Sequence, residues 1–257
     1  MASGLSAPFG AACVGRGILI RVSALAPDEK RRLLTGVSIF SGLSDRELDS
    51  LSAAARRVSF GARKELFHKG DRGTQLYVVA EGRLKALTTS AEGNDMVYNI
   101  MGPGDVIGEI AILGSIERTL TVRTLEKCEL LVLDRRDLLA LLRSRPELAL
   151  ELLAMLAQRV RDMGEKFEEV KFLNLPYRLA RRFEAAARSY GKAEGAEVRI
   201  DLKLSQEEWG ELAGATREAV NKQLRVWTQE GLVRRENGYV ILCRPEEMAR
   251  LAHCVPL

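Results

Sequence analysis

The side chains with the most specific chemistry stand on the outer face of a helix predicted to begin after Thr216. An arginine or lysine can donate hydrogen bonds to guanine O6 and N7, and a glutamate can accept one from cytosine N4. We therefore predict that this helix reads base edges in the major groove of DNA. The side chains on this face are Arg217, Glu218, Asn221, Lys222 and Arg225. A charged outer face also results from simple solvation, so the residues alone leave both interpretations open.

The segments around that helix predict a winged helix-turn-helix. Ser205 can cap a preceding helix, with Glu208 closing a capping box three residues later. Gly214 permits a sharp turn, Thr216 can cap the reading helix, and Asn237-Gly238 is typical of a hairpin turn. Ser205 and Thr216 are also expected among the DNA-contacting residues. The apolar side of the first helix is expected at Trp209, Leu212 and Ala213, and the second helix is expected to run through Val220, Leu224 and Val226.

A second candidate site lies in a region of short apolar runs punctuated by glycine, from Val58 to about Leu133. Strands at this spacing predict an antiparallel barrel or sandwich. Within it, Gly108 precedes a helix-like turn and Arg118 follows; N–H groups at a helix start, together with an arginine, form a compact anion site. A carboxylate such as Glu109 could hold a sugar hydroxyl. A β-turn with a surface salt bridge between Glu109 and Arg118 fits the same residues and is the more common arrangement.

A long helical pattern links the two regions. Pro146 suits its first turn, and Asn174-Leu175-Pro176 interrupts it, so that Asn174 can cap a new helix and form a hinge. Apolar residues recur in steps of four and three, which is a coiled-coil period; they are Leu152, Leu156, Val160, Met163, Phe167 and Val170. A helix packed on its own domain shows a similar stripe, so periodicity favours dimerisation only slightly. Helix-turn-helix proteins usually bind DNA as two-fold dimers, which adds weight.

Composition places the chain among ordinary globular proteins with room for two domains, since it has 257 residues, 46% hydrophobic and 29% charged. A net charge of +4 is too small to indicate nucleic acid, so any basic footprint must be local. No apolar run approaches the roughly 20 residues of a membrane span, and the first residues do not look like a signal peptide, so we expect a cytoplasmic protein. Four scattered cysteines, two histidines and no catalytic motif predict neither a metal site nor an enzyme.

Taken together, the motifs resemble those of the CRP/FNR superfamily of bacterial transcription factors. The run from Gly108 to Leu113, with Arg118-Thr119, resembles the phosphate-binding cassette of cyclic-nucleotide-binding β-rolls, and Ala215 to Lys222 resembles the reading helix. The resemblance covers roughly Val37 to Leu251. It implies an α+β fold with an N-terminal β-roll, a long dimerisation helix and a C-terminal winged helix-turn-helix. The corresponding parts are a flexible extension (1–26), the sensor domain (27–144), the dimerisation helix (145–173) and the DNA-binding domain (174–257).

The resemblance also implies roles in the sensor. Glu109 would bond the ribose 2′-hydroxyl and Arg118 would neutralise the cyclic phosphate, while the cradle is completed by Gly108, Ile110 and Thr119. Relatives that respond to cAMP have a hydroxyl pair on the dimer helix against the adenine, whereas this chain has Met163-Gly164. The base end of the site is therefore open: cAMP is the first expectation, and cyclic di-GMP or no ligand are the alternatives.

The function implied is a homodimeric transcription regulator that reads a palindromic site with TGTGA-like half-sites. Its implied partners are double-stranded DNA, a second copy of the chain and RNA polymerase, with no membrane. A ligand in the β-roll would rotate the DNA-binding domains if it bound one arrangement more tightly than the other. Two alternatives stay open. One is a ligand-independent DNA binder controlled by its amount, phosphorylation or partners, and the other is a nucleotide-binding regulatory subunit that acts through protein contacts.

Overall fold

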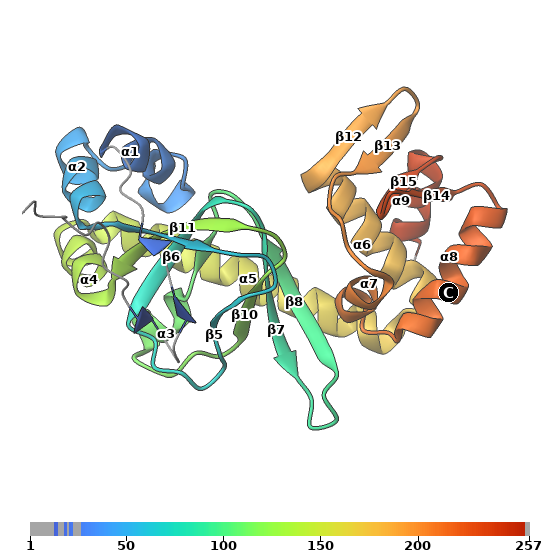
Figure 1. Cartoon of the computed structure of the whole chain (residues 1–257), viewed down its shortest axis with the longest axis horizontal. Helices are drawn as coiled ribbons and strands as arrows, with labels where there is room; N and C mark the ends of the chain where they lie inside the picture. Colours follow the sequence, from blue (N-terminus) through green and yellow to red (C-terminus); the bar gives the residue numbers. More distant parts are fainter. Residues whose placement is uncertain (1–12, 15–17, 20, 23–26, 255–257) are drawn as a thin grey trace, which may run out of the picture. The chain divides into compact units, whose positions relative to one another are not determined.

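The structure is a computed structural model that describes residues 13–14, 18–19, 21–22 and 27–254 (Figure 1). Two compact units result: Met1–Thr88 with Tyr98–Gln158, and Thr89–Val97 with Arg159–Leu257. The predicted extension, residues 1–26, lies almost wholly outside the described residues. In the described part of the chain, no helix has both the length and the apolar character to cross a bilayer.

The first unit is built from two antiparallel sheets with helices beside them. Its helices are α1 (Pro27–Thr35), the 3-10 turn η1 (Ser38–Phe40), α2 (Asp45–Ala54), α3 (Glu109–Gly114), α4 (Arg135–Ser144) and the start of α5 (Pro146–Phe172). Its strands are β1 (Cys13–Val14), β2 (Ile18–Leu19), β3 (Arg21–Val22), β4 (Arg56–Phe60), β5 (Glu65–Phe67), β6 (Gln75–Glu81), β7 (Leu84–Thr89), β8 (Asp95–Met101), β9 (Val106–Ile107), β10 (Thr121–Thr124) and β11 (Cys128–Asp134). The end of β7 and the start of β8 fall in the segment Thr89–Val97, which belongs to the second unit. The sheets run β5-β10-β7-β8 and β3-β4-β11-β6-β9, which confirms the predicted antiparallel roll.

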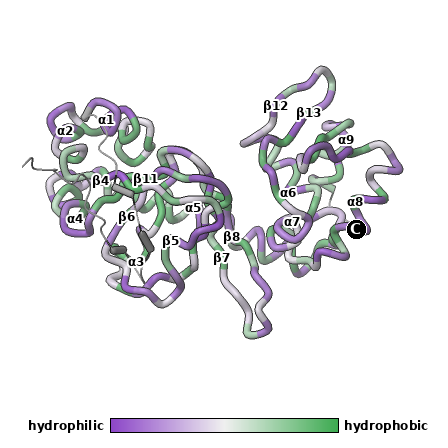
Figure 2. The backbone as a smooth tube through the Cα atoms, viewed as in Figure 1, coloured by the Kyte–Doolittle hydropathy of each residue, from purple (hydrophilic) through white to green (hydrophobic). Residues whose placement is uncertain are grey.

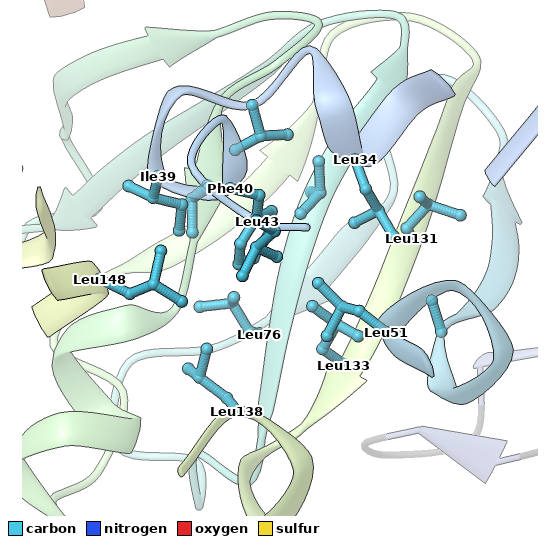
Figure 3. Packing of buried hydrophobic residues seen from close by; sticks show 14 of the residues in the cluster. Leu34, Ile39, Phe40, Leu43, Leu51, Leu76, Leu131, Leu133, Leu138 and Leu148 are labelled. Atoms are coloured by element: carbon cyan, nitrogen blue, oxygen red, sulfur yellow. The ribbon is translucent and has the colours of Figure 1, made fainter. Parts of the chain in front are cut away.

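Strand alternation divides the interior of this unit into two cores. Successive side chains of a strand point to opposite faces, so β6 sends Leu76 and Val78 to one core and Tyr77 to the other. The first core joins the sheet to α1, α2, α4 and the start of α5, and Figure 3 shows Phe40 and Leu148 among its side chains. The second core fills the space within the roll. Strands β6 and β11 therefore contribute side chains to both cores.

The long connecting helix and its interruption are confirmed. Helix α5 ends at Phe172, and α6 (Leu175–Tyr190) begins after a two-residue break at Leu173 and Asn174. Asn174 holds the N-cap position with φ −68° and ψ 156°, but its side chain makes no capping hydrogen bond, so that part of the prediction is wrong. The extended backbone of Asn174, followed by proline in the first turn, is what separates the two helices.

The second unit packs helices on a four-stranded sheet of order β12-β13-β15-β14. Its further elements are β12 (Gly191–Glu194), β13 (Glu197–Ile200), α7 (Gln206–Ala213), α8 (Arg217–Gln229), β14 (Val233–Glu236), β15 (Tyr239–Leu242) and α9 (Pro245–His253). Hydrophobic and hydrophilic residues alternate along α6 (Figure 2), and its buried face presents Phe183 to Trp209 and Trp227 at 4.6 and 5.7 Å between ring centroids. Helix α8 runs through Val220, Leu224 and Val226 as predicted; Val220, Leu224 and Trp227 are buried, whereas Val226 is 39% exposed.

Candidate ligand-binding and DNA-binding sites

The two helices of the helix-turn-helix begin and end at the predicted residues. Ser205 Oγ accepts a hydrogen bond from the Glu208 N–H at 3.1 Å, and the Ser205 N–H donates to Glu208 Oε2 at 2.8 Å. Gly214 ends α7 in the left-handed region with φ +62°, which a side chain would disfavour. Thr216 Oγ1 then accepts from the Ala219 N–H at 3.2 Å and starts α8. These local bonds fix where the first residues of α8 lie.

Helix α8 presents the predicted face to solvent. Arg217, Glu218, Lys222 and Arg225 are exposed and Asn221 is half-buried, while the opposite face is buried in the core. No carboxylate pairs with Arg217, Lys222 or Arg225 in the described part of the chain. The positive charge of this face is therefore available to an external anion.

The hairpin β14–β15 forms a wing beside that face. Its turn residues Asn237 and Gly238 both have positive φ, at +51° and +86°, as a tight two-residue hairpin requires. A cleft of about 580 Å³ separates the wing from the start of α7, and Arg217 and Arg235 are among the residues that line it. The wing and the reading helix thus border one concave, partly basic surface.

The sensor cassette is organised around a buried arginine. Arg118 is only 4% exposed. Its Nη1 donates to the Gly108 carbonyl oxygen at 3.0 Å and its Nη2 to the Gln75 carbonyl oxygen at 2.6 Å. Gly108 has φ +91°, and a Cβ there would lie 2.1 Å from Arg118 Nη1, so a side chain at this position would strain the backbone and displace the guanidinium.

Burial dominates the electrostatics of the cassette. Desolvation lowers the pKa of Arg118, and the nearby Tyr77, Glu109 and Asp71 oppose this effect. Desolvation also raises the pKa of Tyr77. Glu109 is 1% exposed, so the alternative of a surface salt bridge between Glu109 and Arg118 is wrong. A buried cation beside a buried carboxylate is typical of a polar site rather than of a solvated turn.

The remaining predicted cradle residues lie at the surface. Ile110 is 40% exposed and Thr119 is also exposed, while Gly108, Glu109 and Arg118 are brought together. Sequence analysis did not identify Phe67, whose ring centroid lies 4.2 Å from the Arg118 guanidinium carbon. No short-range signal could have found it, because the two residues belong to different strands and loops of the roll.

The apolar stripe of α5 is mostly exposed. Four of its predicted members are 55 to 70% exposed, namely Val160, Met163, Phe167 and Val170. Leu156 is half-buried, and Leu152 is 2% exposed within the core of its own chain, so Leu152 is not available to a partner. Leu150 and Leu153 are exposed in its place and were not predicted. At the start of α5, the side that carries Leu152 therefore packs into the core, and the side that carries Leu150 and Leu153 is exposed.

A β-roll with a buried arginine cassette, followed by a winged helix-turn-helix, defines a class of DNA-binding proteins. Residues 57–145 match the family described as cyclic nucleotide-binding domain. Residues 177–251 match the Crp-like helix-turn-helix domain.

Curated relatives and solved structures agree with these matches. The chain is 31% identical over 220 residues to the CRP-like cAMP-activated global transcriptional regulator of Mycobacterium tuberculosis, covering 86% of this chain and 98% of the relative. The chain belongs to the CRP/FNR family of transcription regulators, whose members bind DNA and act as dimers. It is also 32% identical over 207 residues to the cyclic AMP receptor protein of Thermus thermophilus, covering 80% and 93% of the two chains. The fold matches that of the c-di-GMP responsive global regulator CLP of Xanthomonas campestris, with a TM-score of 0.68, 23% identity and coverage of 77% and 99%.

Proposed function

We propose that this regulator binds a cyclic nucleotide in its roll, with Arg118 on the phosphate and Glu109 on the ribose. The observation that carries the proposal is that both side chains are buried within one cassette, while Arg118 Nε has no hydrogen-bond partner in the described part of the chain. An unpaired buried donor is costly, and an anionic ligand would satisfy it. Gly108 would allow close approach, and Ile110 and Thr119 would close the cradle from the surface.

The nucleotide we propose first is cAMP, because two relatives above 30% identity carry cAMP in their names. The part of the site that would contact the adenine gives cAMP less support. Met163 and Gly164 replace the hydroxyl pair of cAMP-responsive relatives, and nothing lies within 4 Å of the position that a Gly164 side chain would take. Affinity for cAMP should therefore be weaker than in relatives with the hydroxyl pair. Cyclic di-GMP is the second candidate.

We propose that the dimer reads a palindromic, TGTGA-like site in the cytoplasm. Arg217, Glu218 and Lys222 would contact base edges, and Asn221 and Arg225 would support them. Ser205 and Thr216 would present the starts of α7 and α8 to the phosphate backbone. Two copies would associate through the exposed stripe of α5, in a dimerisation helix spanning 145–173 between the sensor (27–144) and the DNA-binding domain (174–257). RNA polymerase is the proposed protein partner.

Calorimetric titration tests the sensor. The full chain is titrated with cAMP, cGMP and cyclic di-GMP, and the Arg118→Ala variant is titrated in parallel after circular dichroism confirms its fold. Loss of binding in the variant is the expected result, because charge-assisted contacts to an anion are hard to replace. If the wild-type chain binds none of the three, and Arg118→Ala leaves DNA affinity unchanged, ligand control is wrong and the regulator acts without a nucleotide.

DNA affinity tests the reading face. Arg217→Ala should lose about 1 to 3 kcal/mol of binding free energy on the palindromic site and relax the preference at one base pair. Fluorescence anisotropy with single-base variants of the site measures this, and Arg250→Ala, which removes an exposed cation of α9, is the matched control. A uniform loss on all sequences would show that Arg217 contacts only phosphate.

A further inference from the structure

The guanidinium of Arg118 lies against two aromatic rings of the roll. Its central carbon is 4.2 Å from the ring centroid of Phe67 on β5 and 5.7 Å from that of Tyr77 on β6. The two rings are themselves 5.9 Å apart at an interplanar angle of 34°. Both rings are buried, Tyr77 at 2% and Phe67 at 9% exposure, so little water competes for the cation. A cation over an aromatic face is attracted most strongly when it is desolvated.

The edges of the same guanidinium are held by the main chain. The carbonyl oxygens of Gly108 and Gln75 accept hydrogen bonds from Nη1 and Nη2. Tyr77 is fixed in turn, because its hydroxyl donates to Gln75 Oε1 at 3.0 Å. The rings thus lie against the guanidinium, and the two carbonyl oxygens hold its terminal nitrogens. Nε is buried and left without a partner in the described part of the chain.

We propose that Phe67 and Tyr77 are positioning residues that hold the Arg118 guanidinium in place and so set the affinity of the site for a phosphate group. This inference rests on the proposed nucleotide-binding function. A free arginine side chain loses many rotamers when it binds an anion, whereas a guanidinium already fixed in a planar fork loses few. The rings therefore act on ligand affinity through Arg118 and need not touch the ligand.

The test compares two identical substitutions in one core. Phe67→Leu removes the ring over Arg118, and Phe60→Leu removes another buried ring of the same core, over which no cation lies in the described residues. In calorimetry of the full chain with cAMP, cGMP and cyclic di-GMP, Phe67→Leu should weaken binding about 3- to 30-fold, as expected for a cation–π contact. Phe60→Leu should leave nucleotide affinity within about twofold of the wild-type value, even if it lowers the melting temperature as much as Phe67→Leu does. Phe67→Tyr keeps a ring over Arg118 and should retain nearly full affinity.

A measurement without ligand tests the positioning directly. In protein labelled with 15N-arginine, the Arg118 Nε–H signal, assigned by its loss in Arg118→Ala, should be displaced by the ring currents and exchange slowly with water. Phe67→Leu should move this signal toward the range of exposed arginines, and Phe67→Tyr should restore it. If Phe67 served only in packing, its replacement would change the melting temperature, but the Arg118 Nε–H signal would not depend on whether residue 67 is aromatic.

The experiments distinguish a failure of the positioning role of Phe67 and Tyr77 from a failure of the proposed nucleotide binding. If Arg118→Ala abolishes nucleotide binding while Phe67→Leu binds as tightly as Phe60→Leu, the nucleotide site stands and the positioning role is wrong. An Arg118 Nε–H signal that is undisplaced in the wild-type chain also overturns the positioning role. If the wild-type chain binds none of the three nucleotides, the proposed ligand control fails and the claim about phosphate affinity falls with it.

Discussion

Replacement of Glu169 by alanine is expected to destabilise the DNA-binding unit strongly. Glu169 lies near the end of α5 with a side chain that is 9% exposed, and it forms ion pairs with Arg181, at 3.2 Å, and with Arg182. Both partners belong to α6, on the far side of the helix break. Arg181 Nε also donates to the Ala252 carbonyl oxygen at 2.8 Å, whereas Glu169 is the one ion-pair partner of Arg182 among the described residues.

The magnitude follows from the burial of each partner. Removing one member of a buried ion pair costs about 3 to 5 kcal/mol, because the other charge stays desolvated without compensation. The Arg182 side chain is 14% exposed and burial lowers its pKa, so it meets this condition. Arg181 is 30% exposed and keeps its bond to Ala252, so its share is small. Because neither partner is completely buried, we expect a loss at or just below the lower end of this range, about 2 to 3 kcal/mol.

Tryptophan fluorescence during urea denaturation measures this loss. The chain has two tryptophans, Trp209 and Trp227, and both pack in the second unit, so the signal reports that unit. The expected shift of the midpoint is about 1 M urea. Glu168→Ala, at the exposed neighbouring position, is the matched control. If Glu169→Ala shifts the midpoint no further than this control, the reasoning from burial is refuted.

Three further predictions concern the helix, the cassette and the dimer. Burial lowers the pKa of Lys166 from its ordinary 10.5 to about 8, so the protonated side chain destabilises the folded state at pH 7. This cost decreases as the pH rises from 8 to 10.5, because the folded state then releases the proton first. In urea denaturation, Lys166→Met should therefore stabilise the chain at pH 7 and stabilise it progressively less above pH 8. Gly108→Ala should abolish calorimetric nucleotide binding by displacing Arg118, whereas Gly93→Ala, with a similar positive φ and open space around it, should not. Phe167→Glu should give monomers in sedimentation velocity and weaken DNA binding at least about 100-fold, because the two half-sites are then bound independently; dimers that persist would place the interface elsewhere.

Local signals explain what could be predicted from the sequence. The capping box at Ser205, the left-handed Gly214, the cap at Thr216 and the Asn237-Gly238 turn each act within a few residues, and the structure contains all of them. The reading face follows directly, because helical spacing alone decides which side chains of α8 share a side.

The misplaced and missed residues depend on contacts between distant segments. Leu152 fits the heptad stripe as well as its neighbours do, but the roll's helical core already covers it. Trp227, which was not predicted, is buried with its ring centroid 5.7 Å from that of Phe183. The cassette could be located by its resemblance to a known motif, whereas Phe67 could not, since its role depends on β5 lying beside the loop that carries Arg118. Tertiary packing, which no local pattern encodes, sets all three.

The ion pairs of Glu169 also bear on the hinge predicted at Asn174. They join the last turns of α5 to α6 across the break, and the Arg178 N–H donates to the Asn174 carbonyl oxygen at 3.3 Å on the far side. The side chain of Val170 lies 3.5 Å from the position of a Cβ on Gly214, so the end of α5 also touches the turn of the helix-turn-helix. Any rotation of α6 about Asn174 must therefore stretch buried ion pairs. A ligand can drive such a rotation only if its affinities for the two arrangements differ by more than the free energy that those pairs lose.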